Sequence, residues 1–419
     1  MKVLIKNATV ISSSSPHNGQ SIDILIENGI IAEIEKQINS SAEQIIQAEG
    51  LHVSAGWIDC FANFCDPGDE FKETLQTGAN AAAAGGFTAV MLVPNTKPVT
   101  DNKSQVEYIV NTGKQLPVTL NVIGSITKKT EGKELSEMYD MYNTGAVAFS
   151  DGINSLQSSG IMLKALQYIL AFNGTIIQLP DDKNIGTYGL MNEGITSTTL
   201  GLQGKPAIAE ELLIARDIEL VKYTGSKIHF TGISTKISLE LIVKAKKDGL
   251  QVTCSVTPYH IFFCDEDLAE YNTNLKVDPP LRTREDMLAL REGVKNGLVD
   301  CIASHHQPQD WDCKTCEFEY AKNGMTGLES LFGVMGICDI NSTDFVKMQS
   351  EHIRKIFNLH LPQIKKGEKA DLTLFNPDIE YLFTEEHIYS KSKNNAFIGK
   401  TLKGRAIGII NGDKVFLNK

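Results

Sequence analysis

The sequence predicts an α/β protein: a (β/α)8 TIM barrel joined to a small β-sandwich that is built from both termini. Two observations support this fold class. Between Ser54 and Ile337, short apolar runs alternate with segments whose apolar residues recur every three or four positions. At both ends of the chain, short strand-like segments are instead separated by polar turns. A length of 419 residues also suits one large barrel and one smaller module.

The barrel is expected over residues 54–365. Its first strand is an unbroken apolar run that ends at a Pro-Gly turn, and seven similar runs follow it. Apolar runs of this length are typical of strands that are buried on both faces. The eight expected strands cover residues 58–64, 88–93, 120–125, 146–150, 175–179, 227–233, 251–256 and 301–303.

Helical segments lie between these strands. Most of them carry apolar residues at three- and four-residue intervals, as expected for helices that cover a barrel. A doubly wound sheet is the structural rival, but it rarely needs eight strand–helix units, and no dinucleotide fingerprint or phosphate loop occurs. The expected helices cover residues 72–84, 104–112, 133–143, 156–172, 207–223, 236–247 and 284–296.

The β-sandwich is expected from residues 1–53 together with residues 366–419. Neither end could bury an apolar face alone, so the two ends are expected to pair. Asn411-Gly412 is the expected turn of a C-terminal hairpin. The expected strands cover residues 3–11, 22–27, 30–34, 44–47, 370–375, 406–410 and 414–417.

Composition excludes several classes of function. A net charge of −11 without a Lys/Arg-rich block argues against nucleic-acid binding. Because no signal peptide and no apolar run of about 18 residues occur, a cytoplasmic protein without membrane spans is expected. Eight cysteines in a chain of this size fit a reducing compartment. Six of them are interpreted as small buried hydrophobic residues: Cys60, Cys65, Cys254, Cys264, Cys301 and Cys338.

The first expected strand carries the most informative feature. In a barrel enzyme, metal-binding His-x-His pairs lie at the carboxyl end of such a strand. In this chain the two alternate positions hold Phe61 and Asn63. The surroundings are typical of a metal-dependent hydrolase, whereas the ligands are absent.

Many short motifs occur together, and in this order they resemble the dihydroorotase branch of the cyclic amidohydrolases over essentially the whole chain. The resemblance implies a barrel of the metal-dependent hydrolase type with a composite sandwich, a role in pyrimidine biosynthesis and catalysis by one or two Zn²⁺ ions. Among the matching motifs are Gly56-Trp-Ile-Asp59, Asp66-Pro-Gly68, Lys72-Glu73, Pro94-Asn-Thr-Lys-Pro98, Met191-Asn-Glu-Gly194, Lys276-Val-Asp-Pro-Pro-Leu-Arg282 and Gly327-Leu-Glu329.

The resemblance also shows where the metal ligands of the family are replaced. Beyond Phe61 and Asn63, the fifth-strand histidine is Gln178, the sixth-strand histidine is Gly232, and the eighth-strand aspartate is His305. Asp151 occupies the bridging position and matches family members that use aspartate there. Phe and Gly cannot bind a metal, and neutral amide oxygens are poor Zn²⁺ ligands. No zinc is therefore expected.

The substrate pocket that the resemblance implies is altered as well. Cys65 stands where the family has an arginine that binds the substrate carboxylate, and Asp278 replaces an asparagine. Both changes disfavour an anionic substrate. Asn95 matches a substrate-contacting asparagine, and His260 matches a histidine that packs near the site.

Three functions follow from these replacements. The first is a non-catalytic structural or regulatory partner of aspartate carbamoyltransferase, assembled as a homodimer or larger oligomer, as the resemblance implies for family members without metal. The second is an active cyclic amidohydrolase with a remodelled mononuclear zinc site formed by Asp151, His305 and His306. The third is a small-molecule sensor that uses the pocket around Asn63, Asn95 and Asp151.

Other residue combinations are weighed against simpler roles. His305 and His306, followed by Cys313-Lys-Thr-Cys316, have the ligand types of a zinc site, but adjacent histidines on one strand point to opposite sides. A loop with reduced thiols is the simpler interpretation. Ser304, His306 and Asp310 could be assembled into a triad only if neighbours on one loop converged. Paired carboxylates can act as an acid and a base, but the acidic clusters Asp181-Asp182 and Asp265-Glu-Asp267 are interpreted as loop caps or solvated groups.

Overall fold

The computed structural model describes residues 1–418 and confirms the predicted barrel. Eight parallel strands follow one another around a sheet in the order β15-β14-β13-β10-β9-β8-β7-β6. A parallel bridge between Ala62 of β6 and His306, in the segment just after β15, closes the sheet. The strands are β6 (Trp57–Ala62), β7 (Phe87–Leu92), β8 (Thr119–Gly124), β9 (Ala146–Phe149), β10 (Ile176–Gln178), β13 (Ile228–Phe230), β14 (Val252–Val256) and β15 (Cys301–Ile302).

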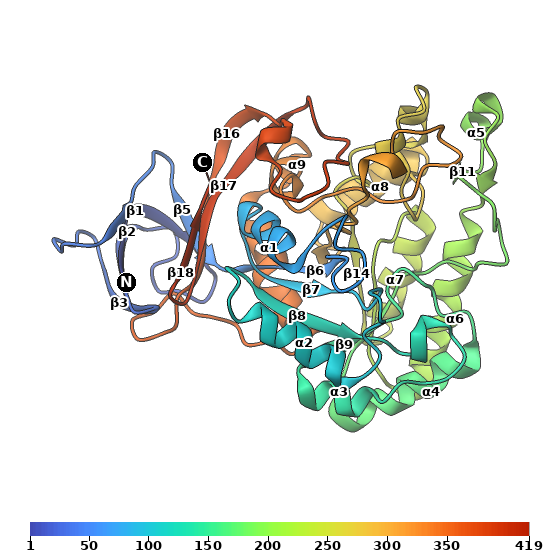
Figure 1. The fold of residues 1–419 in the computed structure, drawn as a ribbon, viewed down its shortest axis with the longest axis horizontal. Coiled ribbons are helices and arrows are strands. Elements are labelled where there is room, and N and C mark those ends of the chain that lie inside the picture. Colours follow the sequence, from blue (N-terminus) through green and yellow to red (C-terminus); the bar gives the residue numbers. More distant parts are fainter. Residues whose placement is uncertain (419) are drawn as a thin grey trace.

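Helices cover the outside of the barrel (Figure 1). They bury the apolar faces that their sequence periodicity predicts, while every residue of β6 and β7 is buried. This arrangement gives a strand no solvent-facing side, which explains the unbroken apolar runs. The covering helices are α1 (Leu75–Ala84), α2 (Lys103–Gly113), α3 (Met138–Thr144), α4 (Ser159–Ile169), α6 (Ile208–Thr224), α7 (Lys236–Lys247) and α8 (Arg284–Lys295).

Several predicted helices begin later than expected, among them α4, which starts at Ser159 instead of residue 156, and two others show the cause. The first starts at Leu75 because the Thr74 side chain accepts a hydrogen bond from the Thr77 backbone, which places the N-cap at residue 74. The helix expected from residue 133 begins only at Met138. The residues before it form a loop in which the Ser136 backbone donates to the carbonyl of Ile126. Local hydrogen bonds therefore set both starting points.

Both termini contribute to one further sheet of eight strands, which confirms the predicted composite β-module. Its order is β18-β17-β16-β5-β1-β2-β3, with β4 paired to β1. Apolar residues from both terminal segments form one core, so the sheet curls over its own inner face. The strands are β1 (Lys2–Ile11), β2 (Ser21–Glu27), β3 (Ile30–Glu35), β4 (Gln44–Ile46), β5 (His52–Ala55), β16 (Asp371–Leu382), β17 (Thr401–Asn411) and β18 (Lys414–Leu417).

Two inserted segments, which belong to neither the barrel strands nor the terminal sheet, approach the carboxyl ends of the barrel strands. After β10, the chain forms β11 (Met191–Asn192), α5 (Ile195–Leu200) and β12 (Gly204–Lys205). Between β16 and β17, residues 383–400 leave the terminal sheet, and Asn394 donates to the carbonyls of Gln307 and Gly324 in the barrel. The chain after β15 includes α9 (Leu331–Ile337), α10 (Ser342–Val346) and α11 (Ile353–Ile356).

Membrane-spanning helices are absent from the described part of the chain. Among residues 1–418, no helix combines the length and the apolar character that a bilayer span requires.

Candidate functional site

A cavity of about 200 Å³ opens at the carboxyl ends of the barrel strands, where barrel enzymes place their active sites. Apolar side chains, among them Val93, Ile153 and Leu179, make up much of its lining, and amide side chains and the charged Asp278 and Lys322 complete it. Its central lining residues are Phe61, Asn63, Asp278, His305, Gln307 and Gln309.

His305 fills the centre of this barrel mouth. Its ring stacks on Phe61, with centroids 4.5 Å apart and an angle of 29° between the planes. On another side it lies against Gly232, where a Cβ would stand 2.5 Å from His305 Cε1. Its Nε2 lies 2.8 Å from the hydroxyl of Thr231. Burial, followed by the neighbouring His260 and His229, lowers the pKa of His305 to about 3, so this imidazole is neutral.

His306 points away from this stack and belongs to a different network. Its Nδ1 accepts a hydrogen bond from the Gly327 backbone at 3.2 Å, so Nε2 carries the proton and lies 3.4 Å from Glu73 Oε2. Glu73 also accepts from the hydroxyls of Thr77 and Ser390. Both ring nitrogens of His306 are therefore occupied in structural hydrogen bonds.

Asp151 follows β9 and anchors the loop after β8. Its carboxylate accepts hydrogen bonds from the backbones of Ile126 and Thr127, at 3.0 and 2.8 Å, and from the Thr127 hydroxyl at 2.5 Å. Burial raises the pKa of Asp151 to about 6. Asn95 donates to the Asp151 carbonyl and accepts from the Ile153 backbone, so it braces the segment that follows β9. Neither side chain lines the mouth cavity.

Two further predicted site residues are held within the barrel. Gln178, at the end of β10, exchanges two long hydrogen bonds of 3.4 Å with the backbone of Leu156. His260 bonds the Thr257 hydroxyl through Nδ1 and the Pro279 carbonyl through Nε2. Burial, followed by the charge of Arg282, lowers the pKa of His260 to about 4. These contacts leave neither side chain directed at the mouth.

The substrate-side replacements lie in two places. Asp278 lines the mouth and pairs with Lys205 at 2.8 Å, and the same ammonium group lies 2.9 Å from Asp181. The ammonium group of Lys205 thus pairs with two carboxylates at once. Cys65 is buried with a positive φ of 59°, and its backbone donates to Asn63 Oδ1 at 2.8 Å. Burial raises the pKa of the Cys65 thiol to about 12.

The residues at the mouth do not fit the zinc centre that the family pattern implies. Within residues 1–418, two groups of three Cys, His, Asp or Glu side chains bring their ligand atoms within 4.8 Å of one another, and neither contains Asp151, His305 or His306. Cys313 and Cys316 belong to neither group. A Phe side chain and the Cα of a glycine replace two ligands at the centre itself. The mouth therefore lacks the donor set that hydrolysis through a bound ion requires.

The simpler alternatives are settled by hydrogen bonds. Ser304 donates to Asp59 Oδ2 at 2.8 Å, and the ring of His306 bonds Glu73, so Ser304, His306 and Asp310 form no relay. Asp181 pairs with Lys205, whereas Asp182 caps its loop by accepting from the Asn184 backbone at 2.9 Å. Asp265 accepts from the Asn192 side chain at 3.0 Å.

Sequence reasoning missed two charged residues of the site. Glu73 lies in the Lys72-Glu73 motif, but nothing in the motif shows that its partners are His306 and Ser390, which lie far along the chain. Lys205 carries no motif of its own. Its role emerges only because β12 places it between Asp181 and Asp278.

Comparisons with known proteins decide the family. A family model described as dihydro-orotase-like matches residues 51–238. The dihydroorotase of Acetivibrio thermocellus is 40% identical over 424 residues, which cover 100% of this chain and 99% of that protein. The chain belongs to the dihydroorotase family. The dihydroorotase of Carboxydothermus hydrogenoformans is likewise 40% identical over 411 residues, covering 96% of this chain and 95% of that protein.

Solved structures agree on the fold of this dihydroorotase-family chain. The L-hydantoinase of Arthrobacter aurescens superposes with a TM-score of 0.84 at 23% identity, covering 100% of this chain and 96% of that one. A D-hydantoinase from Bacillus sp. AR9 gives a TM-score of 0.81 at 19% identity, with coverages of 99% and 94%. These likenesses show the amidohydrolase-type barrel with its terminal sheet.

Proposed function

We propose that this chain is a non-catalytic member of the dihydroorotase family that serves pyrimidine biosynthesis as a structural or regulatory partner of aspartate carbamoyltransferase. One observation carries the proposal. The ring of His305, stacked on Phe61 and seated on Gly232, occupies the centre of the barrel mouth. Of the two residues that contact this ring, Phe61 has a side chain that cannot bind an ion, and Gly232 has no side chain.

The chemistry of ring opening supports the same conclusion. Hydrolysis of a cyclic amide needs an activated water and a group that stabilises the developing oxyanion. His305, with a pKa lowered by burial to about 3, is too weak a base at neutral pH. The two ring nitrogens of His306 are engaged, and the Asp151 carboxylate accepts three hydrogen bonds.

Exposed apolar side chains support a protein partner. Four of them lie on segments that follow β10 and β15 along the chain, and each exposes about three quarters of its surface or more. We infer that they contribute to a partner surface, since protein interfaces are enriched in aromatic side chains such as Tyr and Trp. They are Tyr188, Ile195, Trp311 and Tyr320.

The test combines an activity assay with a binding assay. The purified chain is assayed with dihydroorotate and added Zn²⁺, and it is then mixed with aspartate carbamoyltransferase from the same organism on a size-exclusion column. We expect no turnover above background and a complex larger than either protein. The double variant Ile195→Asp with Trp311→Ser should weaken the complex, whereas the control Tyr223→Ser, exposed on α6, should not.

An active cyclic amidohydrolase is the second candidate, because the relatives with 40% identity are named dihydroorotases. It requires Asp151, His305 and His306 to turn toward a common ion, and each would first give up the hydrogen bonds described above. Turnover that depends on Zn²⁺ and disappears in Asp151→Asn would establish this function instead.

The third candidate, a sensor, would use the amide-lined mouth. Because Asn95 and Asp151 do not line the cavity, Asn63 is the member of the expected set that could contact a ligand. A rise in melting temperature with a pyrimidine precursor, lost in Asn63→Ala, would support it.

A further inference from the structure

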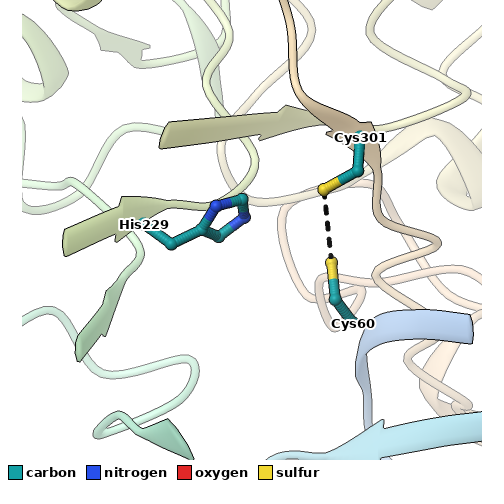
Figure 2. Close-up of side chains that lie close together, drawn as sticks. All are labelled: Cys60, His229 and Cys301. Atoms are coloured by element: carbon teal, nitrogen blue, oxygen red, sulfur yellow. Dashed lines mark hydrogen bonds between the residues drawn. The ribbon is translucent and has the colours of Figure 1, made fainter. Parts of the chain in front are cut away.

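Three side chains with metal-binding atoms meet inside the barrel, below the mouth. They are Cys60 of β6, His229 of β13 and Cys301 of β15, and Figure 2 shows the imidazole facing the two sulfurs. Because β13 is adjacent to neither β6 nor β15 in the sheet, these side chains must meet across the barrel interior. Their exposed fractions are 1%, 0% and 0%.

The spacing of the atoms suits one bound ion. The two sulfurs lie 3.9 Å apart. A Zn–S bond of about 2.3 Å places two sulfurs on one ion roughly 3.8–4.0 Å apart, for tetrahedral or trigonal angles. A nitrogen of His229 lies within 4.8 Å of both sulfurs, so a small rotation of side chains completes the set.

The hydrogen bonds of His229 show which nitrogen would bind. Its Nε2 lies 3.1 Å from the hydroxyl of Ser255, and Ser255 pairs directly with Cys301 on the neighbouring strand. Nε2 is therefore on the side of the sulfurs. Nδ1 lies 2.9 Å from the Thr253 hydroxyl, and a donor bond from Nδ1 would fix the ring in the orientation that metal-binding histidines commonly have.

We propose that Cys60, His229 and Cys301 bind one Zn²⁺ ion inside the barrel, with the hydroxyl of Ser255 available as the fourth donor. Binding releases two protons: Zn²⁺ replaces the thiol hydrogens of Cys60 and Cys301, and the neutral imidazole adds its lone pair. Two thiolates cancel the charge of Zn²⁺, so no net charge is buried. Without the ion, burial raises the pKa of Cys301 well above its usual value and keeps the thiol protonated.

This site lies below the barrel mouth and does not rest on the proposed function. Thr231 links the two places, since its hydroxyl accepts from Ser255 at 3.0 Å and lies 2.8 Å from His305 Nε2. The zinc site shares no ligand with Asp151, His305 and His306, and it joins the first and last strands of the barrel to β13. An ion here would stabilise the closed barrel. The proposed function and the proposed zinc site are independent, so an experiment can refute one of them without refuting the other.

The first experiment measures zinc by elemental mass spectrometry in protein purified without chelators from zinc-supplemented cells. We expect about one zinc per chain, at least tenfold less in Cys60→Ser and Cys301→Ser, and no change in Cys254→Ser or His305→Ala. Cys254 is a matched control because it is buried on β14 and lies outside the cluster. A wild-type protein without zinc, or zinc retained by both cluster variants, would overturn the proposal.

A second measurement keeps the test valid if the serine variants fail to fold. X-ray absorption at the zinc edge of the wild-type protein should show two sulfur neighbours at about 2.3 Å. Neighbours that are only nitrogen and oxygen would place the ion elsewhere and overturn the assignment. So would a disulfide between Cys60 and Cys301 in zinc-free protein, detected by mass spectrometry of unreduced peptides.

Discussion

His305 lies against Gly232 so closely that a Cβ on residue 232 would stand 2.5 Å from His305 Cε1. In the family pattern, residue 232 is a metal-binding histidine and residue 305 an aspartate. Here Gly232, which has no side chain, leaves room for the imidazole ring of His305. The two residues therefore form a packed contact at the centre of the mouth.

The substitution Gly232→Ala tests this contact. Gly232 has φ +66°, so alanine introduces backbone strain as well as a clash with the imidazole. We expect a loss of stability of about 3 kcal/mol from strain and overpacking together. Gly225→Ala is the matched control, because Gly225 has φ +69° with no atom within 4 Å of the added Cβ. Urea unfolding should show a loss at least about 1 kcal/mol smaller for this control; equal losses would mean that His305 is free to move away.

Acid stability should depend on His305. Its folded-state pKa is lowered from 6.5 to about 3, so its contribution to stability is complete above pH 6.5 and decreases as the pH falls toward 3. Between pH 6.5 and pH 5 the loss amounts to about 2 kcal/mol.

The variant His305→Gln should therefore lose about 2 kcal/mol less stability than the wild type over this interval. The control His360→Gln, at an exposed position, should behave like the wild type. Urea unfolding at the two pH values makes the comparison. Parallel losses in His305→Gln and the wild type would show that His305 is not held in its neutral form.

Most of the fold could be predicted from sequence because its periodic signals are strong. The run from Trp57 to Ala62 is apolar at almost every position, and the strand is buried throughout. Boundaries were less accurate, since they depend on caps such as Thr74 and on loop hydrogen bonds such as that of Ser136. The path of residues 383–400 onto the barrel has no periodic signal at all.

The candidate site was harder to predict. Family position identified Phe61, Gly232 and His305 as altered, but no sequence pattern shows that their side chains contact one another. Asp151 and Asn95 were expected in the pocket, yet the carboxylate of Asp151 bonds the loop after β8, and the amide of Asn95 bonds the segment after β9. Contacts such as that of Glu73 with His306 join residues that are distant in the chain, so only the fold reveals them.

Glu73 should be essential for holding residues 383–400 on the barrel. The buried carboxylate lies 3.4 Å from His306 Nε2 and also accepts from Ser390 and from the Lys391 backbone. In Glu73→Gln the amide nitrogen would face these donors, so we expect a loss of about 2–4 kcal/mol. Glu107→Gln, exposed on α2, is the control. Hydrogen exchange should show faster exchange in residues 383–400; unchanged protection would refute the role.

Lys205 should stabilise the fold by pairing with the carboxylates of Asp181 and Asp278, which lie close together beside the mouth. It lies 2.9 Å from Asp181 and 2.8 Å from Asp278, and the pKa of Asp181 is already raised by burial and then by Asp278. Lys205→Met would raise the pKa of Asp181 further, so the variant should lose more stability at pH 8 than at pH 5. At pH 8 we expect Lys205→Met to lower the free energy of unfolding by roughly 2–4 kcal/mol relative to the wild type. The exposed Lys222→Met is the control. A loss independent of pH would contradict the pairing.

The most direct test of the account is the rate of dihydroorotate ring opening by the purified chain in the presence of added Zn²⁺. The packing of His305 against Phe61 and Gly232 predicts a rate equal to that of buffer without protein. Turnover above this background that depends on Zn²⁺ and disappears in Asp151→Asn would contradict the account, because it would show that the mouth still assembles a working metal site.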